Sequence, residues 1–413
     1  MTTVTAMATA ADRPAGGPKG GPARVAARAA IILAALGLAT LTVRTGLAQW
    51  IGLSDPVGAA GLAPHDARIA IAAAQAALGS GAKADSPQVR TLVDNALARD
   101  VTQPGALELK AVQADLAGQK AHEARLFALS DALSRRSLPT RLWLIQHAVD
   151  QGDVPGALAD FDIALRTSSN APKVLFPVLA RATRDPHLTT PIARLLDRPD
   201  DWRLMFLNYA VTQAHAGPGM SAVVLKMRDR RVITDSQVDQ TLVAELVAEQ
   251  QFALARRVRE AFRRTSPDLV QDADFSRADL DYPFGWRLTQ AGDVGAQRVR
   301  VEGQTGLNLR ASPSGSGPVA TQLLTLAPGT YRLWTQTGVA LADPAALPFW
   351  TLTCAQAGGG QIALLDQPAQ ARQAAAIAVT VPTDCPAQWL SLNLRPSDGE
   401  QSGEVARVAV SRP

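Results

Sequence analysis

The sequence predicts a multidomain chain, α and then β, with an N-terminal transmembrane helix, a helical repeat region and a C-terminal antiparallel β-sandwich. Three observations predict this order. A long apolar run lies near the N-terminus, a helical pattern broken by short Gly, Pro, Asp and Ser segments fills residues 63–267, and short alternating segments follow it. With 413 residues, the chain is also too long for one ordinary core.

Composition and charge narrow the function classes. Apolar residues make up 47% of the chain and aromatic residues only 5%, so Ala and Leu supply most of the hydrophobicity, as packed helices prefer. The net charge of +4 is small for this length, and no block of Lys and Arg alternates with aromatic residues. Nucleic acid is therefore not predicted as a partner.

The N-terminal segment predicts export. Residues 1–28, rich in Ala, Gly, Pro and Thr, are predicted to form a disordered cytoplasmic leader. Residues 29–53 are predicted to be a transmembrane anchor, because a spanning helix needs about 20 mostly apolar residues. Arg44 can extend to the headgroups, and Trp50 lies where an interfacial ring anchors a helix. The basic leader keeps the N-terminus in the cytoplasm, so the bulk of the chain would be periplasmic, behind one pass of a bacterial inner membrane.

Two other interpretations of the apolar run stay open. A signal peptide, cleaved after the small-x-small sequence Gly46-Leu47-Ala48 or left uncleaved, is the first, although its leader would be long. A buried helix of a cytoplasmic protein is the second. The anchor and the signal peptide both export everything after Leu53.

The helical region resembles tetratricopeptide (TPR) proteins. The stretch 151–166 reads QGDVPGALADFDIALR, and Ala157, Phe161 and Ala164 share one helix face, as in the second helix of a TPR unit. Gly118 and Gly152 occupy equivalent turn positions. The resemblance implies a solenoid that holds protein partners. Prolines break the pattern after residue 170, so the later part is expected to be TPR-like, with a plain α-solenoid as the alternative.

One helix of this region carries a candidate partner-binding arc. At 100° per residue, the arginines of the segment 252–264 fall on one side and its apolar residues on the other. An anionic partner could dock on that arc, and a solvated helix face is the alternative. The arc consists of Arg256, Arg257, Arg259, Arg263 and Arg264.

The C-terminal part, residues 272–413, is predicted to be a two-sheet sandwich of short strands. Cys354 and Cys385 both lie here and would form a disulfide in an oxidising compartment, with two free buried thiols as the alternative. The predicted strands are Phe284–Thr289, Gln297–Glu302, Gly306–Arg310, Val319–Leu326, Thr330–Thr335, Trp350–Cys354, Ile362–Leu365, Ile377–Val381, Gln388–Asn393 and Ala406–Ser411.

Two motifs give this part a resemblance to jelly-roll carbohydrate-binding modules. The stretch DADFSRADLDYPFGWRL pairs Asp274-Phe275 with Trp286, like the opening of such modules, and LAPGTYRLWTQT is similar to their Pro-Gly-x-Tyr strand. The resemblance implies the jelly-roll fold and sugar binding through exposed aromatic rings on a concave face. It makes polysaccharide a candidate partner.

The sugar-stacking candidates are aromatic residues of the predicted strands, because a flat ring can stack on the apolar face of a sugar. In TYRLWTQT, alternation places Trp334 with Arg332 and Gln336 on one face and Tyr331 with Leu333 on the other, which makes Trp334 the leading candidate. Most of these rings are expected in the core. The candidates are Trp334, Trp286, Trp350 and Trp389.

The remaining polar clusters predict neither catalysis nor a cofactor. The five histidines show no metal-ligand spacing, and no nucleophile elbow, phosphate loop or paired acids occur, so no enzyme and no metal site are predicted. The acidic run Asp272, Asp274, Asp279 and Asp281 matches no calcium loop and is expected to be a solvated linker.

Together these features predict a membrane-anchored periplasmic scaffold. Its TPR-like solenoid would bind other envelope proteins, and its sandwich would bind a glycan or a protein. The organisation resembles accessory proteins of cell-envelope polysaccharide assembly or export. The alternative is a purely structural protein–protein adaptor with no small-molecule or sugar ligand.

Overall fold

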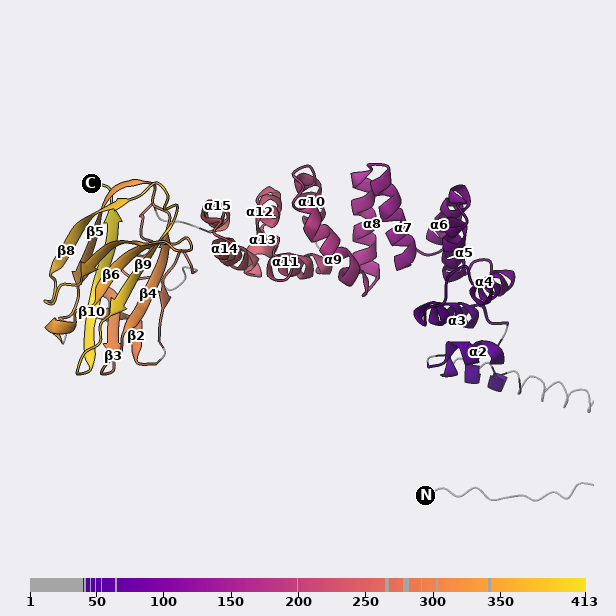
Figure 1. Cartoon of the computed structure of the whole chain (residues 1–413), viewed down its shortest axis with the longest axis horizontal. Helices are drawn as coiled ribbons and strands as arrows, with labels where there is room; N and C mark the ends of the chain where they lie inside the picture. Colours follow the sequence, from indigo (N-terminus) through magenta and orange to yellow (C-terminus); the bar gives the residue numbers. More distant parts are fainter. Residues whose placement is uncertain are drawn as a thin grey trace, which may run out of the picture. The chain divides into compact units, whose positions relative to one another are not determined.

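The computed structural model describes residues 40–413, with gaps at 41, 45, 49, 53, 64, 199, 264–266, 278–281, 291, 302–303 and 341–342. The chain divides into two compact units, residues 1–144 and 145–413 (Figure 1). The leader and most of the anchor segment 29–53 lie outside the described residues. Within the described residues, no helix combines the length and the apolar character needed to cross a membrane.

The first unit is an array of short helices packed through small side chains. Proline at the first turn and Asp side chains at the N-caps start several of them, since both satisfy or avoid the unpaired N–H groups of a helix start. The helices are α2 (Pro56–Leu62), α3 (Ala67–Gly79), α4 (Pro87–Arg99), α5 (Pro104–Leu116), α6 (Lys120–Leu133) and α7 (Leu138–Asp150), the last of which crosses into the second unit.

A buried carboxylate ties three of these helices together. Glu108 of α5 accepts hydrogen bonds from Ser130 of α6 at 3.1 Å and from Thr140 of α7 at 2.8 Å. Ser137, just before α7, donates to the same oxygen. A buried carboxylate needs such donors, because an unpaired one would be strongly destabilising.

The turns between paired helices repeat one geometry. Gly118 and Gly152 both have left-handed backbone, with φ of 76° and 72°. In each turn the following N–H reaches the carbonyl five residues back, from Gln119 to Ala114 and from Asp153 to Ala148. This confirms the predicted turns. Gln250 makes the same turn with φ of 60°, although no glycine marks it in the sequence.

The helices of the second unit become less regular, as the proline content predicts. Pro177 lies inside α9, and α9 packs against α11 through Phe176 and Phe206, whose ring centroids are 5.4 Å apart. These helices are α8 (Val154–Thr167), α9 (Ala171–Ala182), α10 (Thr189–Leu196), α11 (Asp201–Thr212), α12 (Gly217–Lys226), α13 (Arg231–Asp235), α14 (Val238–Ala248) and α15 (Phe252–Phe262).

The helices give way to a jelly-roll-like sandwich of two five-stranded antiparallel sheets, with orders β1-β4-β9-β6-β7 and β2-β3-β10-β5-β8 (Figure 1). Each predicted strand segment overlaps one of its strands. The strands are β1 (Arg287–Leu288), β2 (Val294–Val301), β3 (Gln304–Ala311), β4 (Gly317–Leu324), β5 (Gly329–Thr337), β6 (Phe349–Cys354), β7 (Gln361–Asp366), β8 (Ala374–Val381), β9 (Gln388–Leu394) and β10 (Gln401–Ser411), with a 3₁₀ turn η1 (Pro344–Ala346).

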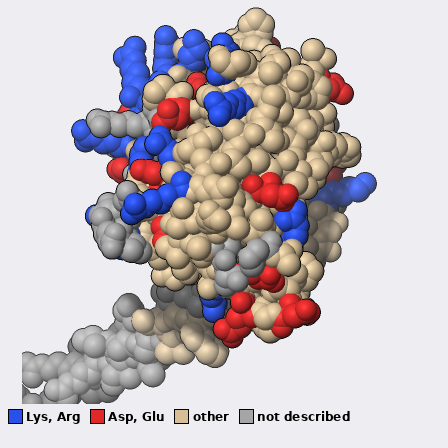
Figure 2. Space-filling model, turned by 90° about the vertical axis from the view of Figure 1, so that its left-hand side faces the viewer, with Lys and Arg blue, Asp and Glu red and all other residues tan. Residues whose placement is uncertain are grey.

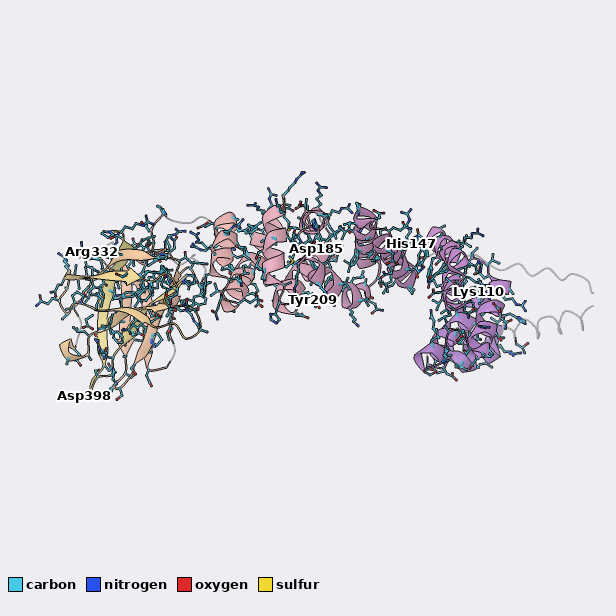
Figure 3. All side chains as sticks on the ribbon, turned by 45° about the horizontal axis from the view of Figure 1, so that its top comes forward. Lys110, His147, Asp185, Tyr209, Arg332 and Asp398 are labelled. Carbon is cyan, nitrogen blue, oxygen red and sulfur yellow. A yellow bond between two sulfur atoms is a disulfide. The ribbon has the colours of Figure 1, made fainter. Side chains whose placement is uncertain are left out.

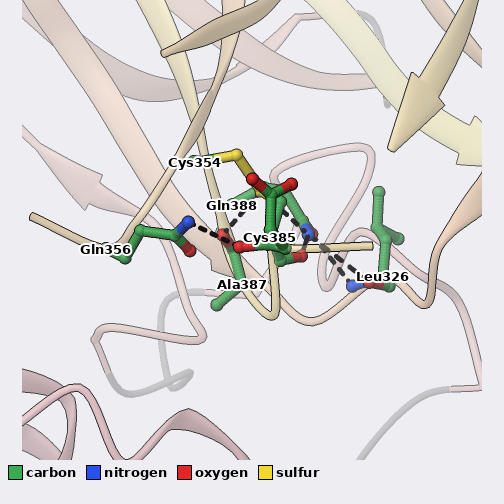
Figure 4. The surroundings of a disulfide bond; sticks show 7 residues. Leu326, Cys354, Gln356, Cys385, Ala387 and Gln388 are labelled. Atoms are coloured by element: carbon green, nitrogen blue, oxygen red, sulfur yellow. Dashed lines mark hydrogen bonds between the residues drawn. A yellow bond between two sulfur atoms is a disulfide. The ribbon is translucent and has the colours of Figure 1, made fainter. Parts of the chain in front are cut away.

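A disulfide joins Cys354, at the end of β6, to Cys385, before β9, which confirms the predicted pair (Figure 4). Gln388 supports this corner: its amide donates to the Cys385 carbonyl at 2.8 Å, and its Oε1 accepts from the Leu326 N–H at 2.9 Å. The loop between the two cysteines contains β7 and β8, one strand from each sheet.

The segment before β1 is part of the sandwich, which corrects the expectation of a solvated linker. Phe275 is buried against Trp286, and the Trp286 indole N–H donates to the Asp272 carbonyl at 3.0 Å. The Asp272 side chain is buried too and lies 3.6 Å from the Arg298 guanidinium. Burial raises its pKa, and the Arg277 N–H and the Arg298 charge partly offset this. Asp279 and Asp281 lie outside the described residues.

Candidate functional site

Two of the four sugar-stacking candidates are core residues. Trp350 is fully buried and Trp286 is 5% exposed. The Trp350 indole N–H donates to Thr335 Oγ1 and to Gln367 Oε1, both at 3.0 Å. Rings enclosed between the sheets cannot stack on a ligand, so the prediction is corrected for these two residues.

Trp334 lies on the outer surface of the sheet β2-β3-β10-β5-β8. Along β5, Tyr331 and Leu333 are buried while Arg332 is exposed and Trp334 is half-buried, as the alternation predicts. The residues opposite Trp334 on the two neighbouring strands are Ala376 of β8 and Ala409 of β10. Because directly opposed residues share a face, small methyl groups flank the ring on both sides and leave it accessible.

Two arginines border this ring. Arg332 lies two residues from Trp334 on β5, and its side chain reaches outward from the sandwich (Figure 3). Arg407 of β10 lies opposite Gln336 and is therefore the diagonal neighbour of Trp334. Both arginines are exposed, and neither forms an ion pair with any residue that the structure describes.

A polar hollow of about 270 Å³ continues the same surface over β2 and β3. Asn308 and Arg310 line it from β3, Gln297 and Gly295 line it from β2, and Gln290 also lines it. Gly295 matters here, because a Cβ at this position would lie 3.3 Å from Arg310 Nε. We call the outer surface formed by Trp334, Arg332, Arg407, Arg310 and Asn308 the arginine face.

The one acidic residue in the strands of this sheet, Glu404, is buried although it lies on the outer surface. Glu404 lies opposite Asn308, is 5% exposed, and packs over Gly306 and Gly338. Burial raises the pKa of Glu404, because a charged carboxylate is poorly solvated there. In Figure 2, which looks at the sandwich end of the chain, a group of Lys and Arg side chains gathers at the upper left and a group of acidic side chains at the bottom.

Trp389, the fourth candidate, lies on the other sheet. It is half-buried on β9, and the Tyr282 ring stacks on it with centroids 6.0 Å apart and planes 12° apart. Arg287 of β1 lies over the Tyr282 ring, with its guanidinium carbon 5.5 Å from the ring centre. Stacking by Tyr282 covers part of the Trp389 ring.

The rest of that surface carries uncharged hydroxyl groups and one ion pair. Ser391 of β9 lies opposite Thr321 of β4 and Thr351 of β6, which forms a row of hydroxyl groups. At its edge, Arg395 binds Asp366 at 2.6 Å and lies 4.3 Å above the Phe349 ring. We call this outer surface the aromatic face, defined by Trp389, Tyr282, Arg287, Ser391 and Thr351.

The arginines of the predicted partner-binding arc of α15 have different surroundings in the structure. Arg256 and Arg257 are exposed. Arg259 is buried and lies 5.1 Å from the Phe284 ring centre, and Arg263 donates to both carboxylate oxygens of Asp239, at 2.5 and 3.0 Å. Arg264 lies outside the described residues. Arg259 and Arg263 therefore have structural roles, which corrects the prediction of one open arc.

Sequence reasoning missed most of the other residues of the arginine face and of the aromatic face. Arg407, Arg310 and Asn308 come from strands far from Trp334 in sequence, and only the cross-strand register brings them to one surface. Arg332 was detectable, since the alternation of β5 already places it beside Trp334. Tyr282 carried no signal of its own.

No protein-family model matches this chain, and no curated protein matches it either. Solved carbohydrate-binding modules match it in part. A family 4 module is 15% identical, over 35% of this chain and 99% of the module, with a TM-score of 0.27. A family 16 module is 14% identical, over 35% and 100%, with a TM-score of 0.26. A xylan-binding domain from Paenibacillus barcinonensis is 11% identical, over 36% and 96%, with a TM-score of 0.26. The C-terminal β-sandwich of this chain is similar to these modules.

Proposed function

We propose that the C-terminal sandwich binds a glycan on the arginine face. One observation carries this proposal: Trp334 offers an accessible ring, flanked by Ala376 and Ala409 and bordered by polar side chains. A sugar ring can stack on such a surface while its hydroxyl groups bond to neighbouring amides and guanidinium groups. Trp389 supports the proposal less, because Tyr282 stacks on it.

The setting that we propose is a membrane-anchored, periplasmic scaffold, accessory to cell-envelope polysaccharide assembly or export. The Cys354–Cys385 disulfide supports an oxidising compartment, since structural disulfides are rare in the cytosol. The apolar run of residues 29–53 supports an anchor or an export signal.

The helical region supports the scaffold role through exposed apolar side chains. Val174 and Val178 lie one turn apart on α9 and are 46% and 53% exposed. Met205 of α11, which packs against α9, is 53% exposed. Exposed apolar side chains on two packed helices favour a protein partner. They also favour the alternative function, an adaptor with no sugar ligand.

A glycan array probed with the full chain tests the proposed function. We expect binding by the wild type, loss of at least about tenfold in affinity for Trp334→Ala, and little change for Trp389→Ala. Hydrogen exchange of β5 would verify that Trp334→Ala keeps its fold. If the folded wild type binds no glycan, the sandwich is an adaptor domain and the proposal is wrong.

Separate experiments test the membrane topology of the chain and its protein partners. A reporter that is active only after export, fused behind Pro413, should be active in bacterial cells. Activity of a cytoplasm-only reporter at the same position would contradict the exported setting. Crosslinking in cells followed by copurification should recover envelope proteins, and substituting Val174 and Met205 by Glu should reduce that recovery.

A further inference from the structure

We infer that the glycan recognised by the arginine face is acidic and carries carboxylate groups, as a polymer of uronic acids does. This inference rests on the proposed function, because it names the chemical class of the glycan that Trp334 would hold. It is carried by the placement of Arg332 and Arg407, which form no ion pair with any described residue, beside the Trp334 ring.

The strands of the sheet β2-β3-β10-β5-β8 carry a marked excess of positive charge. They contain five arginines and one acidic residue, Glu404. Arg298 faces inward and is neutralised by Asp272 at 3.6 Å. Glu404, in turn, is packed over two glycines rather than presented to solvent. The accessible charge of the surface is therefore positive.

Three of these arginines face outward, two of them beside Trp334 and one farther along the sheet. Arg332 lies on the same strand and face as Trp334, about 7 Å along β5, since alternate residues of a strand are spaced by twice its rise. Arg407 is the diagonal cross-strand neighbour of Trp334. Arg310 lines the hollow over β2 and β3. A sugar stacked on the Trp334 ring would thus present its ring substituents to guanidinium groups.

Carboxylate is the group that best matches this arrangement. A guanidinium binds a carboxylate through two parallel hydrogen bonds, and such charge-assisted pairs are about twice as strong as neutral ones. Asp274, whose carboxyl group the Arg407 charge influences, lies outside the strands of the sheet. Burial opposes its ionisation, but hydrogen bonds from Ser276 and the Arg407 charge together lower its pKa. Other arginines of the sandwich, such as Arg395 with Asp366, already have partners.

Single-stranded nucleic acid is a poorer match. Proteins that bind it stack successive bases on several aromatic side chains. Trp334 is the one aromatic residue at an outward position of this sheet among the described residues. Its neighbours Ala376, Ala378 and Ala409 offer no second stacking ring.

The test compares matched polymers on the full chain. A panel of polyuronates, such as polygalacturonate and alginate, is titrated beside the same polymers after reduction of their carboxyl groups to alcohols. We expect at least about tenfold tighter binding to the acidic forms, weakened by rising salt. The double variant Arg332→Gln/Arg407→Gln should lose this preference and bind the acidic and the reduced polymers about equally.

The control keeps the net charge of that variant. Arg90→Gln/Arg125→Gln removes two exposed arginines from helices α4 and α6, and it should bind like the wild type. If it loses the preference equally, net charge and not the arginine face is responsible, and the inference is wrong.

The remaining outcomes separate the inference from the proposed function. Equal binding of acidic and reduced polymers, both lost in Trp334→Ala, keeps the glycan function and overturns the acidic ligand. No binding of any polymer overturns both. Binding of a single-stranded oligonucleotide more tightly than any polyuronate would also overturn the inference, and it would identify a nucleic-acid surface.

Discussion

The two sheets of the sandwich share one core but present different surfaces. The strands of the arginine-face sheet contain five arginines and one acidic residue. The strands of the other sheet contain only Arg287 and Asp366 as charged residues. Most inward positions of both sheets are apolar, as close packing requires. Arg298 pairs with Asp272, whereas the arginines of the arginine face lie at outward positions, where packing places few demands.

This contrast indicates which surface of the sandwich is available to bind a ligand. On the aromatic face, rings and charges satisfy one another: Tyr282 covers Trp389, Arg287 covers Tyr282, and Arg395 pairs with Asp366. On the arginine face, Trp334, Arg332 and Arg407 have no comparable partners among the described residues. Groups without an intramolecular partner are the ones available to a ligand.

The largest expected effect on stability distinguishes the inward ring of Trp350 from the outward ring of Trp334. Trp350→Ala removes a fully buried ring and leaves Thr335 and Gln367 without their indole donor, so we expect a loss of about 3–5 kcal/mol of sandwich stability. Trp334→Ala should cost less than about 1 kcal/mol, since its ring lies half-buried on the outer surface and outside the core. Hydrogen exchange of the β5 and β6 amides measures both. Equal losses would mean that Trp334 belongs to the core, and the comparison would fail.

The disulfide should have the next largest effect. It closes a loop of 31 residues in sequence separation, so the double variant Cys354→Ala/Cys385→Ala is expected to lose about 2–4 kcal/mol. Because β8 lies inside that loop and borders Trp334, its amides should lose the most protection. A reductant should reproduce the effect in the wild type and have none in the variant. An indifferent wild type would contradict a structural disulfide.

Much of the fold could be predicted from sequence because its signals are local. The alternation of β5 fixes which of its residues face inward, and that prediction is confirmed for Tyr331, Arg332 and Trp334. The turn glycines Gly118 and Gly152 stand where left-handed backbone is needed. Gln250 shows the limit, since a non-glycine residue in the same conformation carries no signal.

The site was less predictable because its signals are not local. In β6, FWTLTC, aromatic residues occupy adjacent positions, so alternation does not say whether Phe349 or Trp350 faces inward. The helical wheel of α15 grouped Arg263 with Arg256, but Asp239, which binds Arg263, belongs to another helix. Arg407 and Arg310 join Trp334 only through strand order, which a single sequence does not reveal.

A smaller effect on stability is expected where Glu404 packs over Gly306. A Cβ at Gly306 would lie 2.4 Å from Glu404 Oε1 and 2.9 Å from the Val405 carbonyl oxygen, so Gly306→Ala should cost about 1–3 kcal/mol. Gly360 lies in the turn before β7 of the other sheet, with nothing within 4 Å of its Cβ position, and Gly360→Ala should be close to neutral. Thermal unfolding of both variants measures this. A neutral Gly306→Ala would mean that Glu404 moves freely into solvent.

The smallest effect tests whether the Glu404 carboxylate is held uncharged. Burial raises the pKa of Glu404 above the ordinary 4.5, so the folded state keeps a proton that the unfolded chain has released. Stability should therefore fall as pH rises from about 4.5 through the raised pKa, and level off above it. Asp272 acts in the same direction and is present in both proteins. Glu404→Gln should thus lose less stability than the wild type as the pH rises above 4.5, measured by thermal unfolding. If the two stability curves are parallel, Glu404 is charged at the surface. Its negative charge would then offset part of the positive charge of the arginine face, and the contrast with the aromatic face would be smaller than we propose.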